Sequence, residues 1–113
     1  MTFLSEDLWS NGQPWSEQYR LAGEEWADAE AAAQLLEDTK SAVMAQWQTE
    51  YGDLPVNKAE QMVKASARWR DYVQDTVTAR KEANKAKVRV EYMKMKFSEW
   101  NNSEANARAE RKL

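Results

Sequence analysis

Apolar residues recur at alternating spacings of four and three along two long stretches of this chain. The first seam consists of Trp15, Tyr19, Ala22, Trp26, Ala29, Ala33, Leu36, Lys40, Val43 and Trp47, and the second of Trp69, Tyr72, Thr76, Ala79, Ala83, Ala86, Val90, Met93, Phe97 and Trp100. Only Lys40 and Thr76 interrupt the apolar rows. A 3.5-residue repeat kept over several heptads is typical of long helices that bury a narrow stripe against a partner helix. The pattern therefore predicts two long α-helices.

The two seams match when the helices are paired in opposite directions. With Ala33 opposite Ala83, small residues meet in the middle, where they let the helix backbones approach closely. The pairs that follow from this register are Trp47 with Trp69, Lys40 with Thr76, Trp26 with Val90, Tyr19 with Phe97, and Trp15 with Trp100. We therefore predict an all-α fold, a long antiparallel helical hairpin that resembles a coiled coil. Another register, or pairing with another chain, is the alternative.

Capping and helix-breaking residues predict where the elements begin and end. Gly52 is a natural stop for the first long helix, Asn57 with Glu60 forms a capping box for a short connecting helix, and Ser66 caps the last helix. The predicted parts are an N-terminal arm at 1–14 and a helical hairpin domain at 15–113, with helices at about 15–51, 58–65 and 67–109.

The apolar stripe is wider than a two-stranded coiled coil requires. The apolar residues beside the seams are Leu21, Leu35, Met44, Val73, Val77, Val88 and Tyr92. Two helices cannot enclose a deep core by themselves, whereas two copies of the hairpin would cover these flanks in a four-helix bundle. The sequence therefore predicts a homodimer.

Composition narrows the possible chemistry. The 113 residues include no cysteine and no histidine, so thiolate metal sites, a cysteine nucleophile and the commonest general base are excluded. We expect no catalytic residue, no metal and no cofactor. The chain lacks an apolar stretch long enough to span a membrane and a basic start followed by an apolar core, so we expect a cytoplasmic protein with no membrane partner.

Charge is distributed unevenly between the two halves. Residues 1–38 hold nine acidic side chains and one basic one, whereas residues 39–113 hold fifteen basic and ten acidic ones. One interpretation is structural: Glu25, Asp28, Glu30 and Glu37 beside the first seam meet basic residues of the second helix. The other is contact with nucleic-acid phosphates by Arg80, Lys81, Lys85, Lys87, Arg89, Lys94 and Lys96. A pI near 5.1 favours the structural interpretation and predicts weak nucleic-acid binding or none.

The N-terminal arm combines apolar and acidic residues. Phe3, Leu4, Leu8 and Trp9 stand beside Glu6 and Asp7, as in short motifs that dock into a partner's groove. The alternative is that the arm folds back over its own helices, which would anchor the terminus.

One carboxylate pattern resembles an enzyme motif. Glu24, Glu25 and Asp28, followed by Glu50 and Asp53, resemble the EExxE and ExxD elements of the all-α MazG-type nucleotide pyrophosphohydrolases. That resemblance implies four carboxylates that hold Mg²⁺ against a nucleotide's phosphates. An uninterrupted helix would instead separate the two halves by about 39 Å at 1.5 Å per residue. We therefore treat the hydrolase as an alternative.

Three longer segments resemble small helical proteins encoded by tailed phages and prophages, often near genes for DNA recombination or replication. The segments are EQYRLAGEEWADAEAAAQLLEDTKSAV, LPVNKAEQMVKAS and KVRVEYMKMKFSEWNNSEANARAERKL. The resemblance implies a non-enzymatic accessory or interaction protein in phage DNA metabolism, acting in the host cytoplasm on a protein partner. An inhibitor that binds a host protein through the acidic arm is a further alternative.

Overall fold

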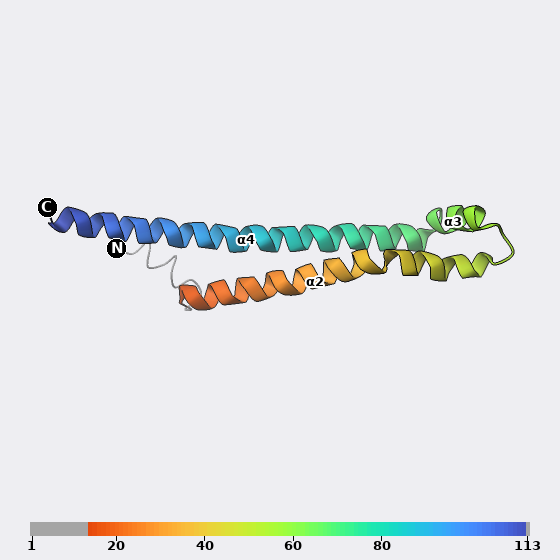
Figure 1. Cartoon of the computed structure of the whole chain (residues 1–113), viewed down its shortest axis with the longest axis horizontal. Coiled ribbons are helices and arrows are strands. Elements are labelled where there is room, and N and C mark those ends of the chain that lie inside the picture. The colour runs from red at the N-terminus through yellow and green to blue at the C-terminus, as the bar shows by residue number, and fades with distance from the viewer. Residues whose placement is uncertain (1–13, 113) are drawn as a thin grey trace. The chain divides into compact units, whose positions relative to one another are not determined.

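The computed structural model describes residues 14–112, and every regular element in that range is a helix (Figure 1). The elements are α2 (Trp15–Gln48), η2 (Thr49–Tyr51), α3 (Val56–Lys64) and α4 (Ala67–Lys112). The predicted all-α class is confirmed. None of these helices combines the length and the apolar character needed to cross a membrane. The described residues fall into two compact units, one of residues 28–83 and one of residues 14–27 with 84–112.

Helix α2 begins where the sequence places it. The Pro14 carbonyl accepts hydrogen bonds from the amides of Glu17 and Gln18, each at 3.1 Å, so the first turn has an acceptor for two otherwise unpaired N–H groups. Glu17 also places a negative charge at the positive end of the helix dipole. The α-helix ends at Gln48 and tightens into η2 before Gly52.

The predicted capping box of the short helix is wrong. Helix α3 begins at Val56 with Pro55 as its N-cap, and no side chain caps it. The Pro55 carbonyl instead accepts from the amides of Lys58 and Ala59, at 3.0 and 2.9 Å. Proline favours this start because its backbone is already extended, with φ −56° and ψ 150° at that residue. Glu60 is therefore available to form an ion pair with Lys64 at 2.9 Å.

The predicted cap of the last helix is present. The Ser66 hydroxyl accepts a hydrogen bond from the Trp69 amide at 3.3 Å, the usual arrangement for a serine N-cap. It also donates to the Val63 carbonyl, so one side chain links the end of α3 to the start of α4.

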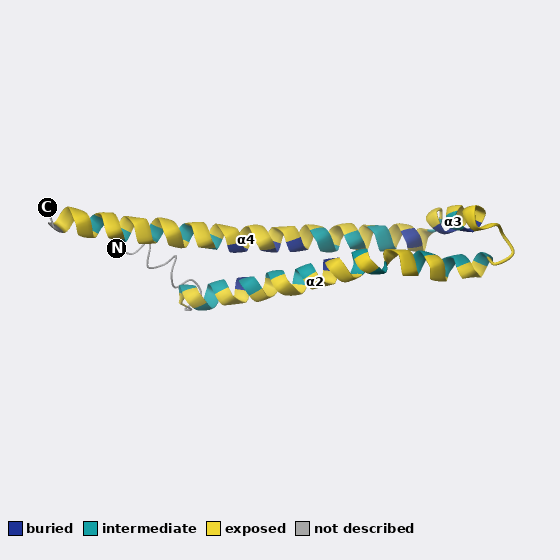
Figure 2. Ribbon diagram, viewed as in Figure 1, coloured by how far each residue is buried: buried dark blue, intermediate teal, exposed yellow. Residues whose placement is uncertain are grey.

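Burial follows the two seams. In Figure 2 the buried and half-buried positions lie along one side of each long helix. Ala33 and Ala83, in the unit of residues 28–83, are both fully buried. Lys40 and Phe97 are the two seam residues that remain exposed. The short helix adds two buried side chains that the heptad pattern did not include, Ala59 and Val63.

Aromatic rings fill one end of the unit of residues 28–83. The Trp47 ring meets Trp69 edge-on at a centroid distance of 6.1 Å, and Trp69 stacks on Tyr72 at 5.6 Å. Arg68 lies over the Trp47 ring at 4.5 Å, and Lys40 lies over Trp69 at 5.9 Å. Such contacts stabilise a core beyond its buried area because rings and cations attract one another electrostatically. The exposed Lys40 thus has a structural contact.

Polar contacts in the same unit show how α2 and α4 are paired there. The Tyr72 hydroxyl donates to the Leu36 carbonyl and lies 3.0 Å from the Thr39 hydroxyl. Arg80 of α4 contacts both Glu30 and Glu37 of α2, and Trp69 of α4 contacts Trp47 of α2. These contacts join α2 to α4 within the unit of residues 28–83.

The predicted register can be tested by a designed disulfide. Introducing cysteine at both Ala33 and Ala83 should give an intramolecular disulfide under mild oxidation, because the register places these fully buried alanines face to face, within the 7 Å that a disulfide spans. Since the chain has no other cysteine, a free-thiol assay and a non-reducing gel measure the result directly. Pairing Ala33 with a cysteine at Thr76 is the control. More efficient bonding in the control than in the test pair would contradict the register.

Candidate functional site

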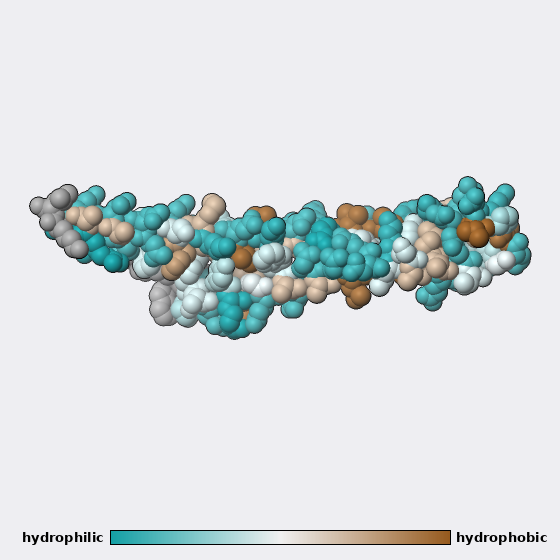
Figure 3. All heavy atoms as spheres, in the orientation of Figure 1, coloured by the Kyte–Doolittle hydropathy of each residue, from teal (hydrophilic) through white to brown (hydrophobic). Residues whose placement is uncertain are grey.

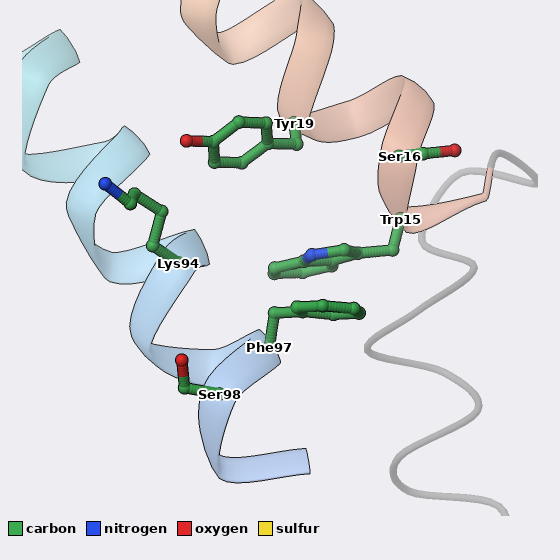
Figure 4. Close-up of a pocket in the computed structure, with 6 residues that line it drawn as sticks. All are labelled: Trp15, Ser16, Tyr19, Lys94, Phe97 and Ser98. Atoms are coloured by element: carbon green, nitrogen blue, oxygen red, sulfur yellow. The ribbon is translucent and has the colours of Figure 1, made fainter. Parts of the chain in front are cut away.

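An aromatic groove lies in the unit of residues 14–27 and 84–112. It has a volume of about 430 Å³ and is lined by Trp15, Ser16, Tyr19, Lys94, Phe97 and Ser98. Figure 4 shows the Trp15 indole lying flat against the Phe97 ring, with the Tyr19 ring and the Lys94 side chain beside them. The Trp15 and Phe97 rings stack at a centroid distance of 6.2 Å and an angle of 11°. We call these six residues the aromatic groove.

The seam pattern had placed the three rings of the groove in a closed core. It paired Trp15 with Trp100, whereas the ring partner of Trp15 is Phe97, and Phe97 in turn stacks on Trp100 at 6.0 Å. Phe97 remains 38% exposed although it is a seam residue. The sequence did contain a signal for this open site, since its three large rings have no small residue opposite them. Large side chains on both helices hold the backbones too far apart for every ring face to be covered.

The chemistry of the aromatic groove is that of a binding surface. Flat ring faces stack against another aromatic group, the Lys94 ammonium attracts an anion, and the Ser98 hydroxyl both donates and accepts hydrogen bonds. The Ser16 hydroxyl points away from the rings (Figure 4). No described carboxylate forms an ion pair with Lys94. The described residues that line the groove include no carboxylate, thiol or imidazole to serve as a general base or metal ligand.

Several predicted acidic and basic partners do meet. Arg80 donates to both Glu37 oxygens, at 2.8 and 2.7 Å, and its Nη1 reaches Glu30 at 2.8 Å. In the other unit Arg89 donates to Glu25 at 2.6 Å. These contacts support the structural interpretation of the charge pattern, since two of the seven proposed phosphate-binding side chains already hold carboxylates.

The remaining predicted nucleic-acid contacts differ among themselves. Lys81, Lys85 and Lys87 are exposed on α4 and form no ion pair with a described carboxylate, and the same holds for Lys94 in the aromatic groove. Lys96 is half-buried and has an interaction of its own. The seven residues therefore differ from one another in exposure and in pairing.

Arg80 also sets the ionisation of its partner. Hydrogen bonding to the guanidinium, reinforced by its charge, holds the pKa of Glu37 below the ordinary value of 4.5. Replacing Arg80 with glutamine should therefore raise the pKa of Glu37, measured by NMR titration of its side chain. Because the folded pKa is lowered, this pair stabilises the fold above about pH 4.5 and the contribution is lost as the pH falls through the lowered value. Lys81→Gln is the matched control, and an equal shift in both variants would contradict the assignment.

The carboxylates that the hydrolase alternative requires are either paired with arginine side chains or exposed. Glu24 forms an ion pair with Arg20 at 2.7 Å, Glu25 holds Arg89, and Glu50 accepts both terminal nitrogens of Arg68. Asp28 and Asp53 are exposed. Between residues 14 and 112 no three acidic side chains gather closely enough to hold a metal ion.

Large apolar side chains also reach the surface outside the groove. Figure 3 shows strongly hydrophobic residues exposed at separate places among hydrophilic ones. In the unit of residues 14–27 and 84–112 the most exposed are Val88 at 63%, Met95 at 60% and Tyr92 at 56%. In the other unit Leu35 and Val77 are exposed. The proposed docking residues of the arm, Phe3, Leu4, Leu8 and Trp9, lie outside the described residues.

Compared with known proteins, the chain matches no family model, no curated protein and no solved structure. The resemblance to small helical phage proteins therefore stays a prediction, and a functional assignment has to rest on the residues themselves.

Proposed function

We propose that the protein is a non-enzymatic interaction protein whose binding surface is the aromatic groove. The observation that carries the proposal is the combination of exposed ring faces with the Lys94 ammonium in a hollow of about 430 Å³. A peptide segment with an aromatic side chain next to a carboxylate matches this surface, because the ring would stack on Trp15 or Tyr19 while the carboxylate approaches Lys94. Phage DNA recombination or replication in the host cytoplasm is the setting that the sequence resemblance supports.

The architecture that we propose for this function is a single antiparallel hairpin of α2 and α4 that forms a homodimer. The order of contacts in the unit of residues 28–83, from Glu37 with Arg80 to Trp47 with Trp69, supports the antiparallel pairing. Exposed apolar side chains beside the seams support association with a second copy, since a soluble protein rarely leaves a continuous apolar row uncovered.

Capture experiments on infected cells test the binding surface. The tagged protein should retain a partner that the variant Lys94→Glu loses, because the reversed charge repels an acidic segment. Lys87→Glu is the matched control, since Lys87 is an exposed lysine one heptad earlier on the same helix and lies outside the groove. Equal capture by both variants, or equal loss in both, would contradict the groove as the binding surface.

Deleting residues 1–13 distinguishes binding through the aromatic groove from binding through the N-terminal arm. These residues carry Phe3, Leu4, Leu8 and Trp9 next to two acids, so they have the chemistry that the groove would select. The truncated chain should bind the partner at least as tightly as the full chain. Loss of capture in the truncated chain, together with normal capture by Lys94→Glu, would favour the host-protein inhibitor that binds through its arm.

Assays on the same purified samples test two other functional classes, nucleic-acid binding and nucleotide hydrolysis. With nucleic acid we expect weak binding that lacks sequence preference and improves at low salt, because paired arginines and nearby acids reduce the field of the lysines. With nucleoside triphosphates and Mg²⁺ we expect no release of pyrophosphate. Release that is abolished by the combined variant Glu24→Gln, Glu25→Gln and Asp28→Asn would overturn the proposal in favour of the hydrolase.

A further inference from the structure

A second heptad row runs along the outer face of α4, away from the seam. It consists of Lys85, Val88, Tyr92, Met95 and Glu99, spaced alternately by three and four residues. All five are exposed among the described residues and lie in one unit. We call them the outer row. Its three apolar members are each more than half exposed, so the described part of the chain leaves this apolar stripe uncovered.

The outer row is complementary to itself when it is reversed. Lys85 and Glu99 lie seven residues before and after Tyr92, while Val88 and Met95 lie four before and three after it. The row thus has an apolar centre, a cation at one end and an anion at the other. Two copies packed in opposite directions would bring each cation to an anion, whereas two copies packed in the same direction would set like charges against one another.

We propose that two copies of the protein associate through their outer rows, antiparallel, about a two-fold axis at Tyr92. In this arrangement Tyr92 meets the partner's Tyr92, Val88 packs on the partner's Met95, and Lys85 pairs with the partner's Glu99. Neither Lys85 nor Glu99 forms an ion pair with a described residue of its own chain, so the pairing breaks no such contact. The inference rests on the proposed homodimer and names its surface and register.

The surface also accounts for residues that neither the seams nor the aromatic groove uses. Val88 and Tyr92 were noted in the sequence as apolar flanks without an assigned neighbour, and Met95 extends the same row. A row of three apolar layers is small compared with the interfaces of obligate dimers, which bury about 2,000 Å² or more. We therefore expect a reversible dimer, with a mass near twice 13.1 kDa by light scattering only at high protein concentration.

Single cysteine variants test the axis, because the chain has no cysteine of its own. Tyr92→Cys should form a disulfide-linked dimer under mild oxidation, since the symmetry brings the two copies of this position together. Asn102→Cys lies on the same helix face but ten residues from the axis, so its two copies would be about 30 Å apart at 1.5 Å per residue. It should remain monomeric on a non-reducing gel. Cross-linking of both Tyr92→Cys and Asn102→Cys would indicate parallel pairing, and cross-linking of Asn102→Cys alone would place the axis elsewhere; either result would overturn the proposal.

Charge reversal tests the register independently. The single variants Lys85→Glu and Glu99→Lys should each raise the dimer dissociation constant about tenfold, because symmetry turns two attractions into two repulsions. The double variant should restore dimerisation. Circular dichroism distinguishes loss of association from loss of folding. A double variant that dissociates as readily as the single ones, or an unmodified chain that stays monomeric at every concentration, would overturn the surface, whereas partner capture through Lys94 would still report on the groove alone.

Discussion

Replacing Trp69 with alanine should lower the free energy of unfolding by about 3–5 kcal/mol, the usual cost of removing a buried tryptophan. Trp69 is only 8% exposed, and its ring contacts Trp47, Tyr72 and Lys40. The truncation therefore removes the contacts of the Trp69 ring with three neighbours at once. It also leaves a cavity, because the surrounding structure relaxes only in part. Chemical denaturation followed by circular dichroism measures the change.

A matched substitution on the same helix shows whether the effect comes from burial. Val77 is 56% exposed, and Val77→Ala should change the free energy of unfolding by no more than about 0.5 kcal/mol, as is usual at the surface. If Trp69→Ala were equally mild, the aromatic cluster would not be the core of the unit of residues 28–83.

Replacing Val63 with aspartate should cost about 3 kcal/mol or more, because a carboxylate would be placed where the side chain is only 1% exposed. Val63 and Ala59 are the two buried residues of α3, so the substitution should release this short helix from the rest of its unit. Amide hydrogen exchange should become faster along Val56–Lys64 before it does so in the adjoining part of α2.

The control for this variant lies at the start of the same helix. Val56 is 72% exposed, and a carboxylate in the first turn interacts favourably with the helix dipole. Val56→Asp should therefore leave the stability unchanged or raise it slightly. Equal destabilisation by the two aspartates would show that α3 tolerates no added charge anywhere, and that burial of Val63 is not the reason.

Much of the helical structure could be predicted from the sequence because long helices depend on local signals. Helix α2 begins at Trp15 as expected, and Ser66 caps α4 as expected. The capping box at Asn57 and Glu60 was wrong because two start signals compete there, and the extended backbone of Pro55 begins the helix two residues earlier. Local patterns do not rank such competing signals.

The candidate site could be predicted less well, because it depends on how large side chains share space. Trp15, Tyr19 and Phe97 carry the same periodic signal as the residues that are buried, and periodicity does not tell an open ring face from a covered one. The hydroxyls of Ser16 and Ser98 have no sequence signal at all, since serine is common on helix surfaces. Lys94 was predicted to bind an anion as part of a basic helix, but the structure places it beside aromatic rings.

What the sequence by itself determined is the all-α class, the sides of the helices that face inward and which segments are acidic or basic. These follow from heptad spacing and charge pattern, which act along each helix. Only the tertiary structure decided which partner each charge takes, as with Arg80 between Glu30 and Glu37, and which short segment covers the core, as with Val63. It also decided that Phe97 stays open. The physical reason is that contacts between distant segments depend on the volumes and lengths of side chains from both segments. The spacing of residues along one helix shows only on which face of that helix each side chain lies.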